Sequence, residues 1–407
     1  MKFNGKNNLY KRKNPGNENT NVNSTYSNWA NKNPRIKILL SVLIVLSCMV
    51  FVFAFFNRDR LSSNNIVSWI CEDILGFGGG QGYPIDIDGT IVENNNFKIM
   101  NKNIAMVSDI SFTSFNKNGK RVVSQQHSFA SPKLKVNGNR AIIYNVGGKG
   151  IQIEYGKSTV YKGTLEKDII ASAISERGNY VVACESNGYL SEMTLYSEKN
   201  EEKYKYYFSE YYITDVAINK KGNYVVASGI SSENGNLKSA IYIFDFKTET
   251  PRSVFEYNDN MIFSVSFLTE NNIAAVGDKN IVFFNVSKGE LNNFSYDNRV
   301  LRCFKNYYNG GSVISLSLTE DGRNCSVISF GTKGNQKLNL DTEFKVKDVA
   351  LKNKSVAVLE SDTIHRYNLK GEKKGEHFIG DDSKQIELLS QHAAYVLGVS
   401  EIYKIHI

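Results

Sequence analysis

A repeat in the middle of the chain restricts the fold more than any other feature. Residues 169–183 (IIASAISERGNYVVA) and residues 213–227 (ITDVAINKKGNYVVA) have closely similar sequences and lie 44 residues apart. Each alternates apolar with small or polar residues on both sides of a Gly-Asn pair, the pattern of two strands joined by a tight turn. Looser copies occupy residues 261–276 and 346–358. A unit that recurs every forty residues or so indicates a fold built from repeated supersecondary units.

The repeat divides the chain into units of four short strands. The last unit, residues 385–407, has only three strands, and one strand is left over at the front, residues 84–92 (PIDIDGTIV). If that strand joins the last unit, the ring closes and no sheet edge stays exposed at the seam. The other predicted units are residues 97–127, 133–165, 168–208, 213–257, 261–296, 300–344 and 346–379.

These units predict an all-β fold, a β-propeller of eight four-stranded blades. Residues 85–407 number 323, which gives about 40 residues for each of eight blades, the usual size of such a unit. Seven blades of about 46 residues are an alternative. A pair of stacked β-sandwiches is a further alternative, but it does not account for the repeat.

An uncharged segment precedes the repeats. Residues 38–56 contain no charged side chain, and as a helix they would be about 28 Å long, which matches the hydrocarbon core of a bilayer. The 37-residue leader and the phenylalanines at the end of the segment are not typical of a cleaved signal peptide. The sequence therefore predicts one uncleaved transmembrane helix, with residues 1–37 cytoplasmic and residues 84–407 extracytoplasmic. The basic residues that flank its N-terminal side are Lys32, Arg35 and Lys37.

The positive charge lies almost entirely in the N-terminal arm. Residues 1–37 carry eight basic side chains and one acidic one, and subtracting this +7 from the total of +8 leaves the other 370 residues at +1. A nucleic-acid-binding domain would carry a basic face on its folded part, so nucleic acid is excluded as a partner. The arm also has eleven asparagines in its first 34 residues and is predicted to be disordered. We expect its lysines to contact anionic lipid headgroups.

Residues 57–83 are predicted to connect the membrane helix to the propeller. Residues 66–75 (IVSWICEDIL) have the spacing of a short amphipathic helix that includes Trp69. The following segment, residues 76–82, is rich in glycine. It lacks the Gly-Lys-Ser/Thr that would complete a phosphate-binding loop, so we interpret it as a connector.

Two resemblances support this organisation. The segment Ser175 to Ala183 resembles the corner between the first two strands of a blade in WD-repeat-like and quinoprotein-like propellers. The whole chain resembles a family of unknown function, whose members are single-pass, propeller-bearing proteins of low-GC Gram-positive bacteria. This resemblance implies a membrane-anchored propeller at the cell surface and supplies no catalytic residues. The features that carry it are the basic arm, the apolar span, Trp69, and residues 76–78, 82–85 and 89.

The sequence shows no catalytic or metal-binding pattern. The tryptophan motifs of quinone-dependent propellers, the Ser-x-Asp-x-Gly-x-x-Trp boxes of sialidases and the Trp-Asp pair of WD repeats do not occur. Residues 86–89 (DIDG) begin like a calcium loop but lack its later ligands. We therefore predict no cofactor, no metal and no enzymatic activity. The histidines fall in different units and form no ligand pair: His127, His365, His377, His392 and His406.

Four cysteines follow the apolar span: Cys71, Cys184, Cys303 and Cys325. An even number in an oxidising compartment permits two disulfides. Their predicted strand positions do not make them obvious neighbours, so we expect buried free thiols. Cys303 would need a nearby histidine base to act as a nucleophile.

One segment is a candidate partner surface. Five tyrosines crowd residues 204–212 (YKYYFSEYY), which span an outer strand and the loop after it. Tyrosine is common at binding surfaces, but it is also a favoured strand residue, so ordinary sheet packing is the alternative. The residues are Tyr204, Tyr206, Tyr207, Tyr211 and Tyr212.

The function predicted from the sequence is a non-catalytic binding or scaffolding module. Its partner would be an envelope protein or a cell-wall component. The alternative is a hydrolase or lyase with its site at the central channel. Acidic and histidine side chains at one mouth of the channel would favour the enzyme, and a lining of serine, asparagine and valine would exclude it.

Overall fold

The computed structural model describes residues 34–56, 80–319 and 321–407, and within the helix α2 (Pro34–Phe56) it describes the side chains of residues 38–52. The chain forms two units, Met1–Leu75 and Gly76–Ile407. Helix α2 includes the predicted span 38–56. Among the described residues, no helix combines the length and the hydropathy that crossing a membrane requires. The predicted arm, the predicted helix at residues 66–75, Trp69, Cys71 and most of the connector lie outside the described residues.

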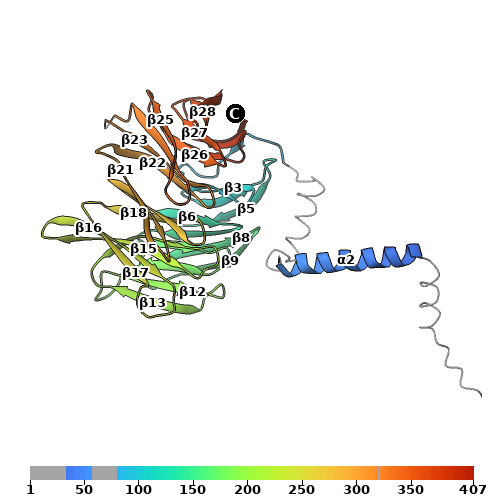
Figure 1. Cartoon of the computed structure of the whole chain (residues 1–407), viewed down its shortest axis with the longest axis horizontal. Coiled ribbons are helices and arrows are strands. Elements are labelled where there is room, and N and C mark those ends of the chain that lie inside the picture. The colour runs from blue at the N-terminus through green and yellow to red at the C-terminus, as the bar shows by residue number, and fades with distance from the viewer. Residues whose placement is uncertain (1–33, 57–79, 320) are drawn as a thin grey trace, which may run out of the picture. The chain divides into compact units, whose positions relative to one another are not determined.

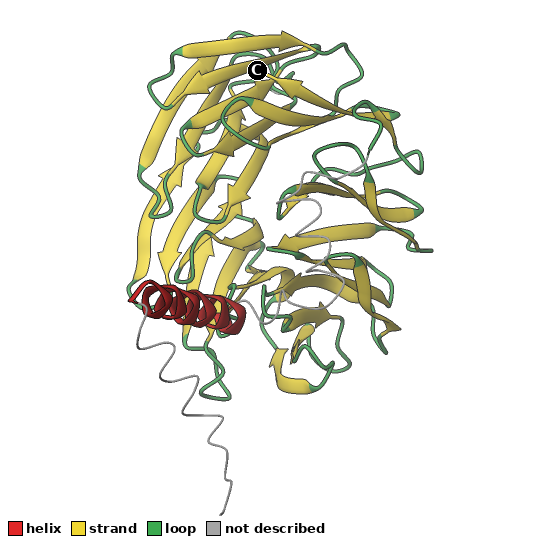
Figure 2. Cartoon of the chain, turned by 90° about the vertical axis from the view of Figure 1, so that its right-hand side faces the viewer, coloured by secondary structure: helices red, strands yellow, loops and turns green. Residues whose placement is uncertain are grey.

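The second unit is a β-propeller with eight four-stranded blades, which confirms the predicted fold class and excludes seven blades (Figures 1 and 2). In seven of the eight blades the chain runs from the innermost to the outermost strand, and in all eight the neighbouring strands are antiparallel. Blades 1 to 4 consist of β2 (Phe97–Met100), β3 (Asn103–Val107), β4 (Ser111–Phe115) and β5 (Arg121–Gln126); β6 (Pro132–Asn137), β7 (Arg140–Asn145), β8 (Gly150–Tyr155) and β9 (Ser158–Thr164); β10 (Ile169–Ile174), β11 (Tyr180–Cys184), β12 (Ser191–Tyr196) and β13 (Glu202–Phe208); and β14 (Tyr212–Ile218), β15 (Val225–Glu233), β16 (Asn236–Phe244) and β17 (Ser253–Asn258).

The remaining blades follow the same order. Blades 5 to 7 consist of β18 (Ile262–Phe267), β19 (Asn272–Gly277), β20 (Asn280–Asn285) and β21 (Gly289–Ser295); β22 (Val300–Tyr307), β23 (Gly311–Ser317), β24 (Cys325–Phe330) and β25 (Gln336–Thr342); and β26 (Asp348–Lys352), β27 (Ser355–Leu359), β28 (Thr363–Asn368) and β29 (Lys373–Phe378). Blade 8 consists of β30 (Gln385–Leu388), β31 (Ala393–Leu397), β32 (Glu401–His406) and, from the start of the propeller, β1 (Ile85–Asp86).

Strand β1 closes the ring as predicted, although it is shorter than the predicted strand at residues 84–92. Ile85 pairs with Ile402 and Asp86 with Glu401. The chain then leaves the sheet, because the backbone amides of Thr90 and Ile91 bind the Asp109 carboxylate instead of a neighbouring strand. This pairing of the first strand with the last joins the two ends of the ring in one blade.

The repeated turn that revealed the blades depends on glycine. Gly178 and Gly222 both lie in the left-handed region, with φ of 99° and 72°. Their amides close tight turns onto the carbonyls of Ser175 and Asn219, at 3.1 and 3.0 Å. Glycine adopts this conformation without the steric cost that a Cβ atom adds.

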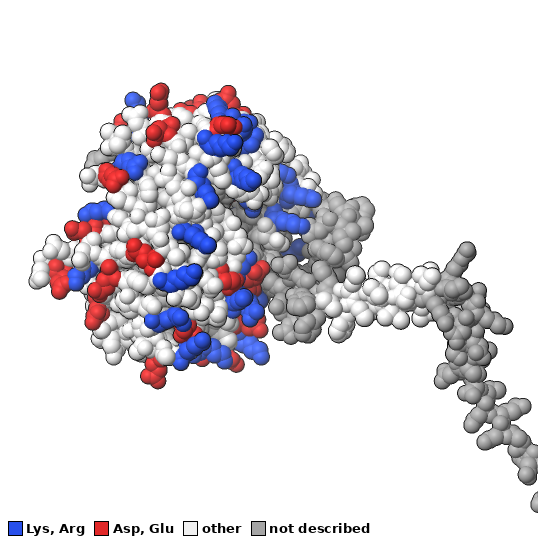
Figure 3. Space-filling model, viewed as in Figure 1, with Lys and Arg blue, Asp and Glu red and all other residues white. Residues whose placement is uncertain are grey.

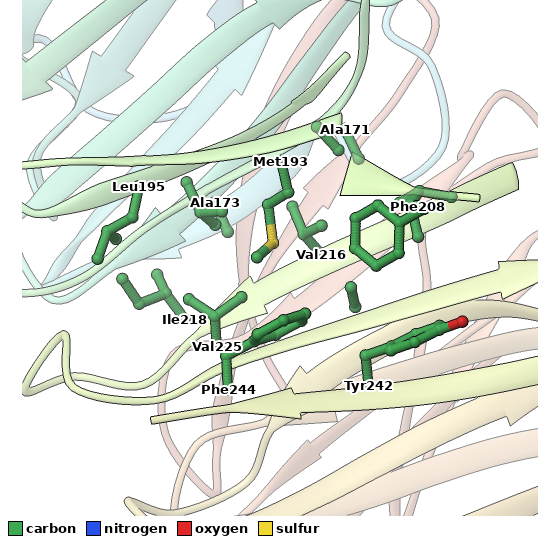
Figure 4. Packing of buried hydrophobic residues seen from close by; sticks show 14 of the residues in the cluster. Ala171, Ala173, Met193, Leu195, Phe208, Val216, Ile218, Val225, Tyr242 and Phe244 are labelled. Atoms are coloured by element: carbon green, nitrogen blue, oxygen red, sulfur yellow. The ribbon is translucent and has the colours of Figure 1, made fainter. Parts of the chain in front are cut away.

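Apolar layers between adjacent blades form the core. Between blades 3 and 4, Met193 and Phe208 on one sheet face Val216 and Phe244 on the other (Figure 4). The same arrangement is present around the ring, including the seam, where Tyr395 and Leu397 of blade 8 share a buried cluster with Phe97 of blade 1. Each sheet is thus buried on both faces, which explains why the second and third strands contain long apolar runs.

The two ends of the propeller differ in their connections. We call the end that carries the links between blades, and the turns between second and third strands, the crossover end. The other end carries the turns between first and second strands and between third and fourth strands, and we call it the hairpin end. At the crossover end the β15–β16 hairpin projects from blade 4 (Figure 1). Its turn has positive φ at Asn234 and Gly235, as a type I′ hairpin requires.

The described chain joins the propeller at the hairpin end. There the Gly82 amide donates to the carbonyl of Asn118, in the turn between β4 and β5, at 3.1 Å. An open hollow of about 520 Å³ lies beside this junction, lined by residues that include Tyr83, Lys117 and Lys404. Because the chain joins at the hairpin end, the crossover end carries no covalent link to residues before Gly80.

Candidate functional site

The structure separates the five tyrosines of the candidate partner surface into two groups. Tyr204 and Tyr206 lie on β13 with their rings against Phe244 of the next blade, with centroids 6.0 and 5.1 Å away. Tyr211 is buried, and its hydroxyl donates to Glu256 Oε1 at 2.6 Å. These three rings belong to the layer between blades 3 and 4. They therefore pack within the sheets, as the alternative to a binding surface predicted, and offer little surface to a partner.

The other two tyrosines are exposed. Tyr207 points away from that layer and stacks on Tyr189 at a centroid distance of 4.8 Å, with Lys205 also near its ring. Tyr212 begins β14 and is 56% exposed. Both lie toward the crossover end of the propeller, but on different faces of their blades. The structure therefore leaves two tyrosines, rather than five, as surface candidates.

Tyr212 lies in a row of exposed apolar residues that the sequence analysis did not identify. The innermost strands of blades 4, 5 and 6 all start at the crossover end, and an exposed large apolar residue lies at or next to each start. These residues are Tyr212, Met261 and Val300, with exposed fractions of 56%, 37% and 38%. Leu318 is 68% exposed and follows Ser317, which pairs with Val300. We call Tyr212, Met261, Val300 and Leu318 the crossover arc.

Exposed apolar residues concentrate at this end of the propeller. Among the described residues of the propeller, ten of the twelve exposed large apolar side chains lie there, and Val160 and Val254 lie toward the other end. A contiguous apolar surface on a soluble domain marks an interaction site more often than isolated exposed residues do. The other six at the crossover end are Ile91, Ile110, Tyr189, Tyr207, Phe378 and Val399.

Carboxylates border the arc on blade 4. Glu210 precedes Tyr211, Glu233 ends β15, and Glu256 lies on β17. All three are exposed, and together they raise the pKa of Tyr211, which burial already raises. Lys238 forms an ion pair with Glu233 across the hairpin. This part of the rim therefore combines aromatic and acidic side chains.

Inside the ring, a partly exposed lysine connects blade 2 to a buried aspartate of blade 4. The ammonium of Lys135 on β6 lies 3.0 Å from both carboxylate oxygens of Asp215 on β14. Burial opposes the charge of Lys135, but Asp215 outweighs it and the pKa of the lysine is raised. The Val265 amide donates to the same carboxylate from β18 at 3.1 Å. Because β10 lies between β6 and β14, the lysine must reach its partner along the channel side of the sheets.

A second cluster connects blades 6, 7 and 8. Lys305 on β22 lies 2.6 Å from Asp348 Oδ2 on β26 and 3.2 Å from Glu387 Oε1 on β30. Tyr307 donates to the other oxygen of Glu387 at 3.1 Å, and the Ile386 amide donates to Asp348 at 2.9 Å. Burial would lower the pKa of Lys305, but the two carboxylates outweigh it and raise that pKa.

The channel fits neither pattern named for the enzyme alternative. In the part of the chain that the structure describes, it has neither a cluster of acidic and histidine side chains at one mouth nor a lining of serine, asparagine and valine alone. Carboxylates do converge on the channel, but Asp215, Asp348 and Glu387 are held by lysines and hydrogen-bond donors rather than placed beside a histidine. Cys303 lies near Lys305, and burial raises the pKa of its thiol well above the usual range, which favours the protonated, weakly nucleophilic form. Among the described residues of the channel, none is a nucleophile with an adjacent base.

The remaining candidate residues have structural contacts. Asp88 of the calcium-like segment forms an ion pair with Arg121 at 2.9 Å. No group of three potential metal ligands was found among the described residues. The described cysteines, Cys48, Cys184, Cys303 and Cys325, are unpaired, and Cys184 and Cys325 are buried.

Comparison with protein families decides where this chain belongs. The model of a family of unknown function, DUF5711, matches residues 81–407. The chain belongs to the DUF5711 family. The matched residues correspond to the propeller, so the DUF5711 region is the eight-bladed unit described above. Among curated proteins, none matches the sequence significantly.

Solved structures resemble the DUF5711 propeller in fold. BamB from Moraxella catarrhalis has a TM-score of 0.50 at 10% identity, over 79% of this chain and all of that chain. The C-terminal WD40 domain of Sif2 has a TM-score of 0.55 at 12% identity, over 81% of this chain and 99% of that chain. At these identities the similarity shows the propeller fold alone.

Weak sequence signals existed for the residues that were missed. Lys305 follows apolar residues on its strand (VLRCFKNY), and a charge beside such residues can indicate a partner, although Arg302 on the same strand shows that this signal is weak. Asp215 occupies a repeat position where the preceding copy, in blade 3, has Ala171. The arc had no comparable signal, because its residues are ordinary strand residues whose exposure depends on where each strand begins.

Proposed function

We propose that this DUF5711 protein is a membrane-anchored, extracytoplasmic propeller that binds a partner protein of the cell envelope through its crossover arc. The observation that carries the proposal is the alignment of Tyr212, Met261 and Val300 on three successive innermost strands, with Leu318 beside them. Tyrosine is enriched among the residues that carry most of the energy of a protein interface, and methionine is enriched in interfaces generally. A cell-wall glycan is less favoured because the arc offers apolar surface rather than converging hydrogen-bond donors.

The shape of the propeller supports this use. Apolar layers on both faces of each sheet make the ring rigid, and the β15–β16 hairpin adds an edge beside Tyr212. The covalent link to the rest of the chain is at the hairpin end, so it does not occupy the arc. The face drawn in Figure 3 carries basic and acidic side chains interspersed, which fits a protein partner better than a polyanion.

The membrane anchor rests on the sequence. Residues 38–56 are uncharged, helix α2 covers them, and basic residues precede them. Protease treatment of intact cells stripped of their wall tests this part of the proposal. An N-terminal epitope should be protected while the propeller is accessible from outside. Release of the full chain by alkaline carbonate, or protection of the propeller, would contradict the anchored, outward-facing arrangement.

Site-specific photocrosslinking tests the binding face. A photoreactive phenylalanine analogue at Met261 or Val300 should give one discrete adduct with an envelope protein in cells that make this chain. The matched control is Val254, which is exposed on the outermost strand of blade 4, away from the arc. Adducts of equal intensity at all three positions, or none at Met261 and Val300, would refute the arc as the binding face.

A further inference from the structure

The two ends of the propeller carry opposite charge, although the chain after residue 37 is close to neutral. In the turns of the hairpin end, between first and second and between third and fourth strands, fourteen residues are lysine or arginine and seven are acidic, which gives +7. In the turns and links of the crossover end, eight of the described residues are lysine or arginine and sixteen are acidic, which gives −8. The mixed charges of Figure 3 belong to a side view that includes both ends.

The positive charges of the hairpin end are accessible. Of the fourteen basic side chains in its turns, all but Lys220 are exposed. Among the described residues, no carboxylate lies within ion-pair distance of Lys117, Lys120 or Lys354, in contrast with Lys220, which is paired with Glu176. An exposed cation without a counter-charge in the folded chain can bind an anionic partner without breaking an existing ion pair.

The positive charge is most one-sided where the chain enters the propeller. The entering strand β1 belongs to blade 8, and the hairpin-end turns of the neighbouring blades 7 and 1 contain five lysines and a single carboxylate, Glu372. The open hollow of about 520 Å³ lies beside this point, and the described residues that line it include Lys117, Lys404 and His406 but no acidic residue. The Lys404 ammonium donates to the carbonyl of Lys117 at 2.8 Å. The entry point is therefore a basic surface with a concave part.

The covalent link limits how far this surface can lie from helix α2. Residues 57–79, 23 in number, separate Phe56 from Gly80. A fully extended chain covers about 3.3–3.6 Å per residue, so Gly80 can lie no further than about 85 Å from Phe56. If α2 crosses a membrane, the hairpin end is the end of the propeller that is attached to the bilayer.

We propose that the hairpin end rests on the anionic lipid surface of the membrane, with the crossover arc facing away from it. This orientation rests on the membrane anchor of the proposed function. The lysines attract the phosphates of anionic headgroups over about one Debye length, roughly 8 Å at physiological salt. The acidic crossover end is repelled by the same surface, so the charges of both ends favour one orientation. The arc is then left open to its partner.

Energy transfer in reconstituted vesicles tests the orientation. The full-length chain carries a coumarin amino acid at Ser158 of the hairpin end or at Asn236 of the crossover end, both of which are exposed and uncharged. The vesicles contain an acceptor on a lipid headgroup and consist of phosphatidylcholine alone, or of equal parts of phosphatidylcholine and phosphatidylglycerol. We expect phosphatidylglycerol to raise transfer from Ser158 by about twofold or more and not to raise transfer from Asn236. Salt at about 1 M should remove the difference, because screening then leaves a range of only about 3 Å.

Matched variants identify the charges responsible. A triple variant removes three lysines that surround the entry point: Lys117→Gln, Lys120→Gln and Lys354→Gln. It should lower transfer from Ser158 in the anionic vesicles toward the value in phosphatidylcholine. The control removes the same charge from three exposed lysines of the crossover end and should not lower that transfer: Lys279→Gln, Lys345→Gln and Lys384→Gln. Thermal denaturation confirms that each variant is folded.

Flotation of the same vesicles separates failure of this inference from failure of the anchor. A chain that floats with both kinds of vesicle, but whose transfer from Ser158 does not depend on the lipid, keeps its anchor and overturns the docking. A chain that floats only with the anionic vesicles, and only at low salt, lacks the anchor and supports the docking. Transfer that is unchanged in the triple variant, or lowered equally in the control, also overturns the proposal. Binding of duplex DNA without a response of Ser158 to lipid would assign the basic end to nucleic acid instead.

Discussion

The channel and the crossover arc reverse the usual distribution of residues in a protein. Lysines and carboxylates are buried in the channel, whereas large apolar side chains are exposed at the arc. The two regions are adjacent, because the innermost strands that supply the channel groups also begin with the residues of the arc. Strand β14 shows both, with Tyr212 exposed at its start and Asp215 buried three residues later.

The same strands thus carry buried charges, which affect stability, and exposed apolar residues, which affect binding. A buried charge must be paired or it destabilises the fold, so the channel clusters are part of the folding free energy. Substituting an exposed apolar residue changes the free energy of unfolding little. The residues of the arc can therefore be selected for binding without loss of stability. Substitutions in the two regions should therefore separate stability from binding.

The largest effect is expected for the paired lysine of the channel. Lys305→Ala leaves Asp348 and Glu387 buried without their cation, which should lower the free energy of unfolding by about 3–5 kcal/mol. Denaturant unfolding followed by tyrosine fluorescence measures this change. An effect below 1 kcal/mol would mean that water already screens the cluster, and the contrast with the arc would be lost.

Lys98 lies on β2, the innermost strand of blade 1, and forms no ion pair with a carboxylate of the described residues, so it should behave in the opposite way. Lys98→Met removes a charge that burial disfavours, so unfolding free energy at pH 7 should rise, on the order of 1–3 kcal/mol. The native pKa of about 8 lies below that of the unfolded chain, so the unfolded state binds more protons between the two values. The stability of the unsubstituted protein should therefore increase as pH rises from 8 toward 10, and the advantage of Lys98→Met should shrink.

The measurement is chemical unfolding of both proteins at pH 7, 9 and 10, in buffer without phosphate or carboxylate. Lys305 provides the contrast, since its native pKa is raised. Its stabilising contribution should be complete at pH 7 and should be lost only as the pH rises through that raised value. A Lys98→Met protein that is less stable than the original at pH 7 would show that Lys98 has a partner inside the protein.

A buried and an exposed tyrosine give a test with a smaller expected effect on stability. Tyr211→Phe removes the hydroxyl that donates to Glu256 at 2.6 Å and should cost about 1 kcal/mol. The hydroxyl and the carboxylate favour each other only while the phenol is protonated, and the pKa of Tyr211 is raised. Thermal unfolding at pH 7 measures the loss, with Tyr207→Phe as the exposed control, for which no change is expected.

The sequence predicted the architecture well because the evidence for it is local and repeated. The turn at Gly178 recurs at Gly222, and alternation within each strand separates the two faces of a sheet. The pairing of β1 with β32 could also be predicted, because a blade of three strands needs a fourth. These inferences use patterns within a few residues, counted many times along the chain.

The candidate site could not be predicted in the same way, because it depends on where distant strands meet. The sequence grouped Tyr204 and Tyr206 with Tyr207. Alternation along β13, however, places Tyr204 and Tyr206 on one face of the sheet and Tyr207 on the other. Lys305 and Glu387 are 82 positions apart in sequence and meet only because the ring brings blades 6 and 8 to one channel. Neither relation is visible in any local pattern.

The smallest effect on stability is expected at the arc, together with the largest effect on binding. The double variant Tyr212→Ser, Met261→Ser should change the free energy of unfolding by less than about 0.5 kcal/mol for each substitution, because both side chains are exposed. The same variant should abolish the photocrosslinked adduct at Val300, since interface anchors near the centre of a contact carry most of its energy. A stable double variant that still forms the adduct would place the binding surface elsewhere on the crossover end, with Leu318 and the β15–β16 hairpin as the next positions to probe. A variant that unfolds instead would show that Tyr212 and Met261 belong to the core of blades 4 and 5, and the proposed division between channel and arc would fail.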